Sequence, residues 1–284
     1  QSTNPWPPRK LLPGLLWVVF FLMVPLSSLF VMTFWRSTLS GMEPDWTLAS
    51  YTTLVTQPVY LQLLFKSTRI ALSVTGLTLL FAYPFAYWSM NKTARQKVML
   101  MFLILIPFWT SYLVRTYAWF PLLGNTGLFN LVLLKLGLIS QPLDIFLFNE
   151  GTVHLAMVYV YLPFAIVPIS LSLDRLDRTL LDAAADLGAP PWKGFVRVTL
   201  PLSLPGVLAG AIIVFILSVG AFVAPALLGG ASGVMIANVI PDMFGAGMNW
   251  PLGSTLSFLV MVTTIFWIWL IGSRVGLREI FVGK

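Results

Sequence analysis

The sequence contains no cysteine and very little charge, and both shortages narrow what the protein can be. Without cysteine there is no disulfide framework and no Cys-based metal site. Only 10% of the 284 residues are charged, whereas 58% are hydrophobic and the mean hydropathy is +0.87. A soluble domain carries roughly 25% charged residues, which it needs to cover its surface. Much of this protein's surface must therefore face lipid.

The apolar residues gather in six stretches, each close to the roughly 20 residues that a membrane-spanning helix requires. The stretches are 11–34, 70–90, 98–119, 152–173, 207–228 and 252–272. They predict an all-α integral membrane protein with six transmembrane helices in one domain, residues 1–284. The first stretch is too long for the core of a signal peptide, so we expect a retained helix. Membrane helices tolerate proline, and we expect kinks at Pro25, Pro84, Pro107, Pro163, Pro168 and Pro225.

The basic residues are unevenly distributed, and this predicts the topology. Five of the 17 fall on one side of the predicted bundle, namely Arg36, Lys66, Arg69, Arg115 and Lys135. The other twelve fall on the opposite side, namely Arg9, Lys10, Lys92, Arg95, Lys97, Arg175, Arg178, Lys193, Arg197, Arg274, Arg278 and Lys284. Basic residues accumulate on the cytoplasmic side of membrane proteins. We therefore expect both termini and the segments 91–97 and 174–206 in the cytoplasm, and a short interfacial helix within the outer segment 124–138.

The segment 174–206 is the most polar long segment of the chain and predicts a helical hairpin. One apolar face recurs at helical spacing: Leu180, Leu181, Ala184 and Leu187. Gly188 is placed to end this first helix in the left-handed conformation. Pro190 or Pro191 can open a second helix, which we expect to end at Pro201. Such a hairpin either folds back on its own bundle or provides a binding site for a peripheral motor subunit.

The same segment carries a motif with fixed spacing. Asp182-Ala183-Ala184 is followed by three residues, Gly188, nine residues, Val198, one residue and then Leu200-Pro201. This pattern resembles the signature of the permease subunits of ABC importers with the type I fold, with Asp in place of Glu and Val in place of Ile. In that family the segment carries the coupling helix, which sits in a groove of the ATPase subunit. The resemblance implies that the coupling residues here are Asp182, Ala183, Ala184, Gly188, Leu200 and Pro201.

The resemblance also implies partners, because one such subunit encloses only half a pathway. It implies a second homologous permease subunit, as a heterodimer, with two cytoplasmic ATPase subunits and an extracytoplasmic solute-binding protein. The chain itself has no Walker A pattern, so it is expected to need no cofactor and to be no enzyme, with ATP and Mg used by the partner ATPase. The resemblance implies that the protein lies in the bacterial inner membrane, where it contacts lipid, and that it does not bind nucleic acid. Transport would proceed by alternating access, a two-state change biased by ligands at both ends.

Other segments resemble the spermidine/putrescine permeases, whose wider group also imports opines and phosphonates. The segments are Pro107-Phe108-Trp109-Thr110 with Arg115-Thr116-Tyr117, Tyr161-Leu162-Pro163-Phe164, and Leu227-Leu228-Gly229-Gly230 with Asn249-Trp250-Pro251. Ala226 departs from the polyamine permeases, which carry an acidic residue just before the Leu-Leu-Gly-Gly stretch. The solute implied is a polyamine such as spermidine or putrescine, with an opine, phosphonate or amino-acid derivative as the alternative.

Aromatic residues near the third to fifth stretches are the candidates for the solute pathway. The leading rings are Trp109, Tyr112, Tyr159 and Phe222, with Tyr117 and Tyr161 beside them. Each ring face attracts an ammonium group by roughly 0.5–2 kcal/mol, although packing alone also explains such rings. Arg115 is a charge inside a predicted span, which either has a function or reaches the headgroups. Asp242 and Glu150 are outer carboxylates able to draw cations, and the lone His154 is expected to pack at the interface.

Two other functional classes fit this sequence less well than an importer subunit. A membrane-embedded enzyme needs a catalytic constellation inside the bundle, and the six stretches contain no Asp or Glu in their interiors. A passive channel would have no use for the hairpin motif, and it would conduct without an ATPase.

Overall fold

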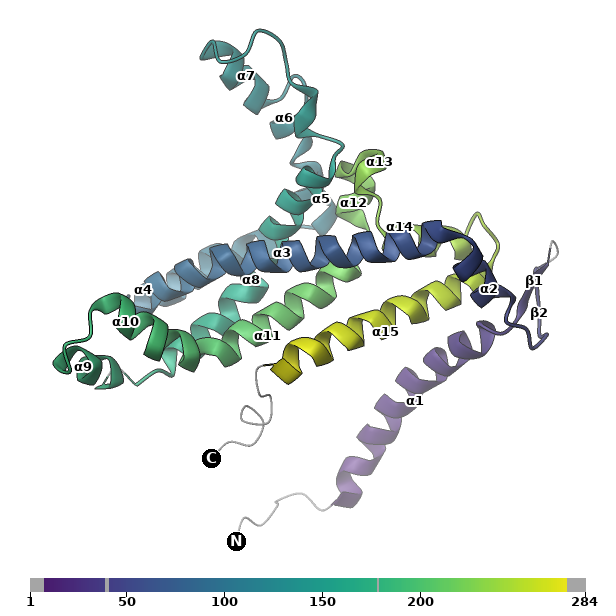
Figure 1. Ribbon diagram of the computed structural model, residues 1–284, viewed down its shortest axis with the longest axis horizontal. Coiled ribbons are helices and arrows are strands. Elements are labelled where there is room, and N and C mark those ends of the chain that lie inside the picture. Colours follow the sequence, from purple (N-terminus) through teal and green to yellow (C-terminus); the bar gives the residue numbers. More distant parts are fainter. Residues whose placement is uncertain (1–7, 39–40, 178, 275–284) are drawn as a thin grey trace. The chain divides into compact units, whose positions relative to one another are not determined.

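The computed structural model describes residues 8–38, 41–177 and 179–274, and these are helical almost throughout (Figure 1). The basic residues Arg178, Arg278 and Lys284, counted above for topology, lie outside the described residues. The helices are α1 (Pro8–Met32), α2 (Ala49–Thr56), α3 (Pro58–Met90), α4 (Ala94–Leu105), α5 (Tyr112–Tyr117), α6 (Phe120–Leu123), α7 (Leu128–Lys135), α8 (Glu150–Asp174), α9 (Thr179–Asp186), α10 (Pro191–Gly194), α11 (Leu200–Val219), α12 (Val223–Leu228), α13 (Gly230–Gly233), α14 (Ile236–Phe244) and α15 (Trp250–Arg274). Short 3₁₀ segments cover Ile106–Trp109 and Asp144–Phe146, and a π-helical turn covers Phe195–Thr199.

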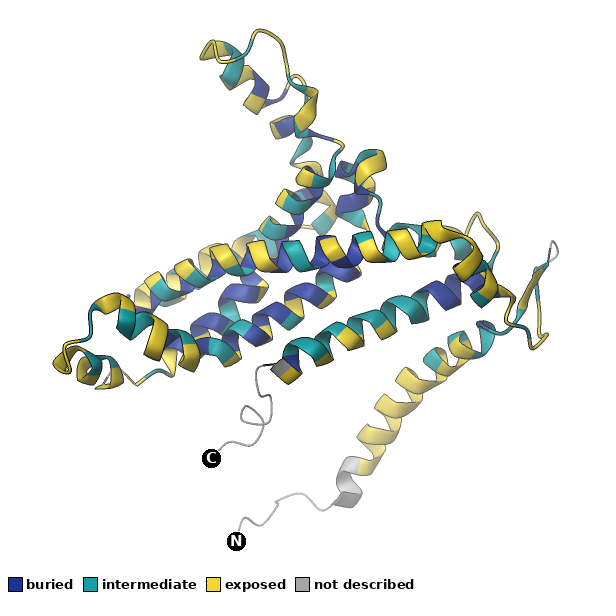
Figure 2. Ribbon diagram, viewed as in Figure 1, coloured by how far each residue is buried: buried dark blue, intermediate teal, exposed yellow. Residues whose placement is uncertain are grey.

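The chain forms two compact units. The larger comprises Leu63–Asn238 and Thr263–Lys284, and the smaller comprises Gln1–Gln62 and Val239–Val262. In the smaller unit, α1 is followed by an antiparallel pair of short strands, β1 (Arg36–Thr38) and β2 (Gly41–Glu43). Apolar side chains along most of α1 are exposed (Figure 2).

The larger unit is built around the close pair α8 and α11, which lie side by side (Figure 1). Gly206 and Gly210 stand four residues apart on α11, the spacing at which small residues let membrane helices approach. A Cβ on Gly206 would lie 2.5 Å from the carbonyl oxygen of Pro168 and 2.5 Å from the Cβ of Ser172. A Cβ on Gly210 would lie 3.2 Å from the Cα of Ala165. The two glycines therefore set how closely α11 packs on α8.

Apolar and small polar side chains fill the interior of this unit. The largest fully buried ones include Phe215, Ile70, Met157, Ile166 and Ile169. Buried hydroxyls bridge elements that are distant in the chain. The Tyr161 hydroxyl donates to the carbonyl oxygen of Leu217 at 3.1 Å, and the Ser67 hydroxyl accepts from the N–H of Ile236 at 2.8 Å.

Six stretches of the described chain are long and apolar enough to span a membrane. Four of them agree with predicted spans apart from their ends, and α3 starts at Pro58, twelve residues before the prediction. The predicted interfacial helix in 124–138 is the shorter α7. Kinks at Pro25, Pro84, Pro163 and Pro168 stay predictions, since each of these prolines lies inside a continuous helix.

The predicted third span, 98–119, is wrong as a continuous helix. α4 ends at Leu105, a 3₁₀ turn begins at Ile106, and Thr110 and Ser111 are extended before α5 starts at Tyr112. Pro107 lacks an N–H and cannot continue the α-helical ladder, so the chain tightens there and then breaks. By length and composition the third candidate span is Tyr112–Lys135, which itself comprises the separate helices α5, α6 and α7.

The predicted fifth span, 207–228, is also wrong at its outer end. α11 begins at Leu200 and ends at Val219, and residues 220–222 separate it from α12. Pro225 therefore lies in the first turn of a separate short helix and does not kink a longer one. Gly220 and Ala221, two small residues at the break, allow the chain to turn there.

Candidate functional site

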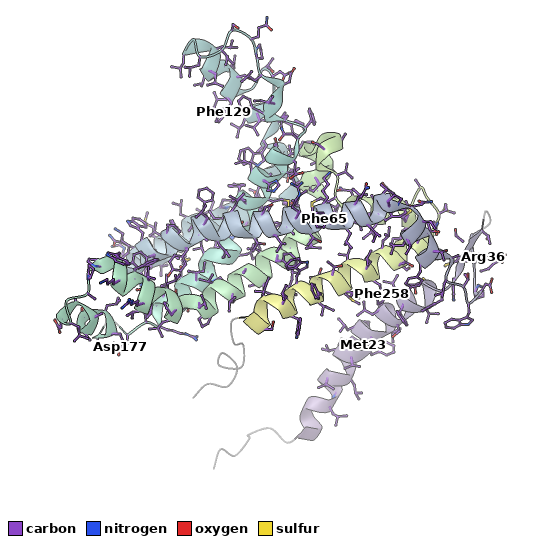
Figure 3. All side chains as sticks on the ribbon, viewed as in Figure 1. Met23, Arg36, Phe65, Phe129, Asp177 and Phe258 are labelled. Carbon is purple, nitrogen blue, oxygen red and sulfur yellow. The ribbon has the colours of Figure 1, made fainter. Side chains whose placement is uncertain are left out.

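The first arm of the hairpin is α9, whose start is fixed by an acidic side chain. The N–H of Thr179 donates to Oδ1 of Asp177 at 3.0 Å, which satisfies a donor that the first turn of a helix leaves free. This hydrogen bond from the Thr179 backbone holds the pKa of the exposed Asp177 carboxyl below its ordinary value. Asp177 is labelled in Figure 3, where it lies just before α9. The local sequence therefore determines where the first arm begins.

Gly188 ends this arm as predicted. Its φ is +77°, the left-handed conformation that glycine adopts without steric penalty. The N–H of Gly188 donates to the carbonyl oxygen of Ala185 at 2.8 Å, and the N–H of Ala189 donates to that of Ala184 at 3.0 Å. These two bonds form a Schellman motif, which satisfies the last carbonyls of α9 and turns the chain.

The second arm opens at Pro191 as predicted but does not end at Pro201. Pro190 caps α10 in an extended conformation, and Pro191 is its first residue. The backbone then passes through the π-helical turn at Phe195–Thr199 into α11, where Pro201 lies in the first turn. A proline inside a helix removes an N–H and crowds the carbonyl four residues earlier. The wider π turn relieves both conflicts, so the arm and the spanning helix are continuous.

Side chains at the base of the hairpin tie it to the neighbouring helices. The ring of Phe195 packs edge-on against Tyr87 at 5.1 Å and against Tyr83 at 5.8 Å, both on α3. The hydroxyls of Tyr83 and Ser203 lie 2.9 Å apart, which joins α3 to α11. Lys97 on α4 forms an ion pair with Asp174, the last residue of α8. A movement of the hairpin is therefore linked to α3, α4 and α8.

The outer face of the hairpin is exposed and partly apolar. The predicted apolar face divides, because Leu181 and Ala184 are half-buried whereas Leu180 and Leu187 are exposed. We use the term hairpin surface for the exposed residues Leu180, Asp182, Ala183, Leu187, Gly188, Trp192 and Val196. Leu187 is 89% exposed and Trp192 is 63% exposed. Large apolar side chains held out on a polar hairpin are typical of a protein-interaction site.

The remaining motif residues support this surface. Val198 and Leu200 are half-buried, and Pro201 is exposed on the first turn of α11. The motif therefore has a surface part in α9 and a supporting part in the second arm. What each residue does in coupling stays a prediction.

The candidate pathway residues of the broken third span form one small cluster. The Arg115 guanidinium lies over the ring of Phe108 at 4.5 Å and near that of Tyr112 at 6.0 Å. Phe108 packs edge-on against Phe164 of α8 at 5.1 Å. Among the described residues Arg115 forms no ion pair, and its Nε is buried without a hydrogen-bond partner. Arg115 thus rests against ring faces, and not against a carboxylate.

The other pathway candidates are more dispersed. Trp109 is 82% exposed, and Phe222 is half exposed at the start of α12, which packs against α5. Tyr159 on α8 is also exposed, and its ring packs edge-on against Trp119 at 5.8 Å. Asp242 is exposed and belongs to the other compact unit. The structure therefore brings Tyr112 and Arg115 together with Phe108, and leaves Trp109 free to meet a partner.

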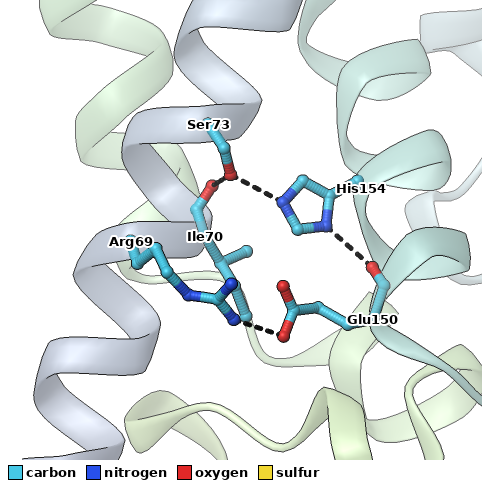
Figure 4. A network of polar contacts seen from close by, with 5 residues as sticks. All are labelled: Arg69, Ile70, Ser73, Glu150 and His154. Atoms are coloured by element: carbon cyan, nitrogen blue, oxygen red, sulfur yellow. Dashed lines mark hydrogen bonds and ion pairs between the residues drawn. The ribbon is translucent and has the colours of Figure 1, made fainter.

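His154 and Glu150 belong to a network that joins α3 to α8 (Figure 4). Nδ1 of His154 lies 2.7 Å from the carbonyl oxygen of Glu150, so this nitrogen carries the proton. Nε2 lies 2.6 Å from the hydroxyl of Ser73, which also lies 2.9 Å from the carbonyl oxygen of Ile70. The Glu150 carboxylate pairs with Arg69 at 2.5 Å. Glu150 is thus neutralised within the chain, which removes it as a free attractor of cations.

Sequence reasoning missed two contacts that shape the site. The ion pair between Lys97 and Asp174 joins residues far apart in the chain, and no local sequence pattern predicts it. The Gly206–Gly210 pair is different, because its small-xxx-small spacing is visible in the sequence and was not used.

Comparison with known proteins places most of the chain among transport subunits. No family model matches it. It is 36% identical over 254 residues to the spermidine/putrescine transport system permease protein PotB of Haemophilus influenzae, covering 88% of each chain. It is 35% identical over 247 residues to PotB of Escherichia coli, covering 87% of this chain and 89% of the relative. The inner membrane ABC transporter permease protein YdcU of Escherichia coli is 32% identical over 233 residues, 78% of this chain and 74% of YdcU.

Solved structures share the fold at much lower identity. The crystal structure of a bacterial ABC transporter involved in the import of alginate superposes with a TM-score of 0.72 at 17% identity, covering 97% of this chain and 95% of that chain. The crystal structure of a bacterial alginate ABC transporter in complex with an alginate pentasaccharide-bound periplasmic protein superposes with a TM-score of 0.72 at 18% identity. It covers 96% of this chain and 93% of that chain. At this identity the likeness concerns the fold alone.

Proposed function

Because the chain belongs to the family of ABC importer permease subunits that includes the PotB proteins, we propose that its solute is a polyamine such as spermidine or putrescine. As such a subunit, it is a multi-pass protein of the inner membrane and not an enzyme. ATP hydrolysis belongs to the partner ATPase. The polyamine assignment is supported by relatives that carry this name and align with nearly nine-tenths of the chain.

The hairpin surface is the proposed docking site for the ATPase. The observation that supports it is the pair of exposed apolar side chains, Leu187 and Trp192, held out on either side of the Gly188 turn. A surface of this kind gains stability when a partner covers it, because burial removes apolar area from water. The ties from Phe195 to α3 and from Asp174 to α4 then carry the movement of the hairpin into the bundle.

The complete importer would contain two permease subunits, this chain and a different homologous one. Two ATPase subunits would engage the hairpins from the cytoplasm, using ATP and Mg, and a solute-binding protein would deliver solute on the outer side. Both termini would lie in the cytoplasm. ATP binding would draw the hairpins together and open the bundle outward, and hydrolysis would reset it, as two states biased by ligands.

Ring faces are the proposed compensation for the charge of the polyamine. A multivalent cation in a low-dielectric bundle needs carboxylates or ring quadrupoles around it. Trp109 and Phe222 are exposed rings on two segments whose helices, α5 and α12, pack together. Tyr112 and Tyr159 are the further candidates, while Asp242 would act at the outer mouth. The carboxylates themselves would come from the second permease subunit.

The experiment is ATPase activity of the complete importer, reconstituted with its own binding protein. We expect spermidine or putrescine to stimulate hydrolysis above the basal rate. Trp109→Ala and Phe222→Ala should each raise the polyamine concentration for half-maximal stimulation by about threefold or more, because each removes one ring face. Phe65→Ala, which removes a ring that is 74% exposed from α3, should leave this concentration unchanged.

One observation favours a second candidate solute, which is anionic or zwitterionic. Arg115 has no carboxylate partner among the described residues, and Ala226 stands where the polyamine permeases carry an acid. On this alternative, a phosphonate, opine or amino-acid derivative would neutralise Arg115. Stimulation by such a solute and none by polyamines would reject the polyamine proposal. Arg115→Gln should then abolish that stimulation, whereas Arg115→Lys should retain part of it.

A further inference from the structure

A groove of about 490 Å³ lies between α4 and α8, close to the base of the hairpin. It is lined by Ser89, Lys97, Val98, Met101, Phe102, Leu105, Val167, Ser170, Leu171 and Asp174. These helices pack together near the α9–α10 end of the larger unit (Figure 1). Val98 is 71% exposed and Phe102 is 53% exposed, so the groove is open to the outside of the chain. Its place beside Asp174 separates it from the proposed solute route along Trp109 and Phe222.

The lining residues change character along the groove in an ordered way. Lys97 and Asp174 form an ion pair at one end, with side chains 27% and 42% exposed. One helical turn further along α8, about 6 Å away, lies Ser170. Beyond it the walls are apolar, with Met101 and Leu105 on α4 facing Val167 on α8. Along the groove, the charged pair, the hydroxyl and the apolar wall follow one another in the same order as the headgroup, the ester and the acyl chain of a phospholipid.

Ser170 supplies an independent sign that the groove binds something. The residue is 5% exposed, and its hydroxyl is buried without a hydrogen-bond partner. A serine inside a helix usually donates back to a carbonyl three or four residues earlier, as Ser89 does to Ala86 at 2.8 Å. A buried hydroxyl left unpaired costs free energy, and an acceptor that enters the groove removes that cost. Rotation of the Ser170 side chain toward the groove would let its hydroxyl donate to an ester carbonyl of a lipid at this depth.

Basic residues near this end of α4 mark the membrane interface, and the pair that lines the groove selects the headgroup. Lys92 lies on the turn that joins α3 to α4, with its ammonium 4.3 Å from the ring centre of Trp88, and Arg95 lies in the first turn of α4; both are outside the groove lining. Trp beside basic residues is typical of the membrane interface. At the groove itself, however, Lys97 and Asp174 present one charge of each sign. A headgroup that contains both a phosphate and a primary ammonium satisfies both, whereas a purely anionic headgroup would face the Asp174 carboxylate.

We propose that the α4–α8 groove is a binding site for one phospholipid with a phosphoethanolamine headgroup. Its phosphate pairs with Lys97 and its ammonium donates to Asp174. An ester carbonyl accepts from Ser170, and one acyl chain lies along Met101 and Leu105. The lipid sits beside the last residue of α8, where the hairpin begins.

Native mass spectrometry of the purified importer complex tests this site. Delipidated complex is titrated separately with palmitoyl-oleoyl phosphatidylethanolamine, phosphatidylglycerol and phosphatidylcholine. We expect a discrete first adduct that forms at lower concentration with the ethanolamine lipid than with the other two. Lys97→Ala should weaken this adduct about tenfold, since it removes a charged hydrogen bond. Ser170→Ala should weaken it by a smaller factor.

Matched variants separate this site from general lipid contact. Arg95→Ala removes an exposed charge from the first turn of α4, and Ser172→Ala removes a hydroxyl from α8 outside the groove, so both should bind as the unaltered complex does. Asp174→Asn should remove the preference for ethanolamine over choline, because it removes the carboxylate that the ammonium needs. Three results would each overturn the proposal. They are an equal loss of lipid binding in Lys97→Ala and Arg95→Ala, tighter binding of phosphatidylglycerol than of phosphatidylethanolamine, and no preference among the three lipids.

Discussion

Gly188 shows how one residue can control the hairpin through its backbone alone. A Cβ built on it would meet nothing within 4 Å, so there is space for a side chain. Its φ of +77° is nevertheless disfavoured for residues that carry a Cβ, by roughly 1–2 kcal/mol, and more for β-branched ones. Any effect of substitution therefore arises from the conformation of the turn, and not from a clash with neighbours.

We predict that Gly188→Val uncouples ATP hydrolysis from transport while the protein still inserts and assembles. The valine disfavours the left-handed turn, so Leu187 and Trp192 no longer project together. Solute uptake into proteoliposomes and ATPase stimulation, measured on the same preparation, should both fall severalfold. Gly188→Asn is the matched control, because asparagine tolerates this conformation, and it should retain most of the uptake. Full uptake by the valine variant would contradict this role for the turn.

At the scale of elements, α9 presents two leucines with opposite surroundings. Leu187 is 89% exposed at the end of the helix, whereas Leu181 is half-buried and packs with the apolar cluster of the bundle. The Cδ2 of Leu181 also lies 4.0 Å from where a Cβ on Gly194 would be, so it spans the two arms of the hairpin. The first leucine is available to a partner, and the second holds the arms together.

Leu187→Asp should therefore reduce co-purification of the ATPase without lowering the thermal stability of the permease. Leu181→Asp should lower both, since it places a charge at the packed base of the hairpin. Pull-down of the ATPase and thermal unfolding in detergent distinguish the two variants. If Leu187→Asp retains the ATPase as well as the unaltered chain does, the hairpin surface is not the docking site.

The sequence predicts helices better than it predicts their interruptions. Hydropathy over 20-residue windows located the long apolar helices, and the capping residues Gly188 and Pro191 located the hairpin. The breaks at 110–111 and 220–222 were missed, because an apolar run looks the same whether its helix is continuous or not. Pro107 and Gly220 mark the two places locally, but the packing of α5 against α12 that accompanies the breaks is in no local pattern. The same holds for Pro201, whose helix survives only because a π turn precedes it.

At the scale of the whole molecule, the ion pair between Lys97 and Asp174 brings two basic segments to the same side. It places the start of α4 beside the end of α8, so the segments 91–97 and 174–206 adjoin, as the charge distribution predicted. The cytoplasmic location of that side stays a prediction. The absence of cysteine provides a clean background for testing it.

We predict that Asn91→Cys is protected from an impermeant thiol reagent in intact cells and that Ser140→Cys is labelled. Both positions are exposed, and Asn91 is preferred to its neighbour Thr93, whose side chain caps α4. Asn91→Cys should become reactive once the membrane is permeabilised, which shows that the thiol itself is accessible. Labelling of position 91 and protection of position 140 in intact cells would reverse the topology.

The two interrupted segments have a consequence for hydration. No side chain caps the start of α5 or of α12, so the first N–H groups of both helices lack a partner from a capping side chain. Hydrocarbon offers no acceptor, and each such group left alone there costs several kcal/mol. The interruptions are therefore compatible with a membrane only if solvent or another subunit reaches them. Where solvent is what reaches them, water enters the membrane along the packed pair α5 and α12, and an ion would then approach Arg115 through a hydrated vestibule instead of through hydrocarbon.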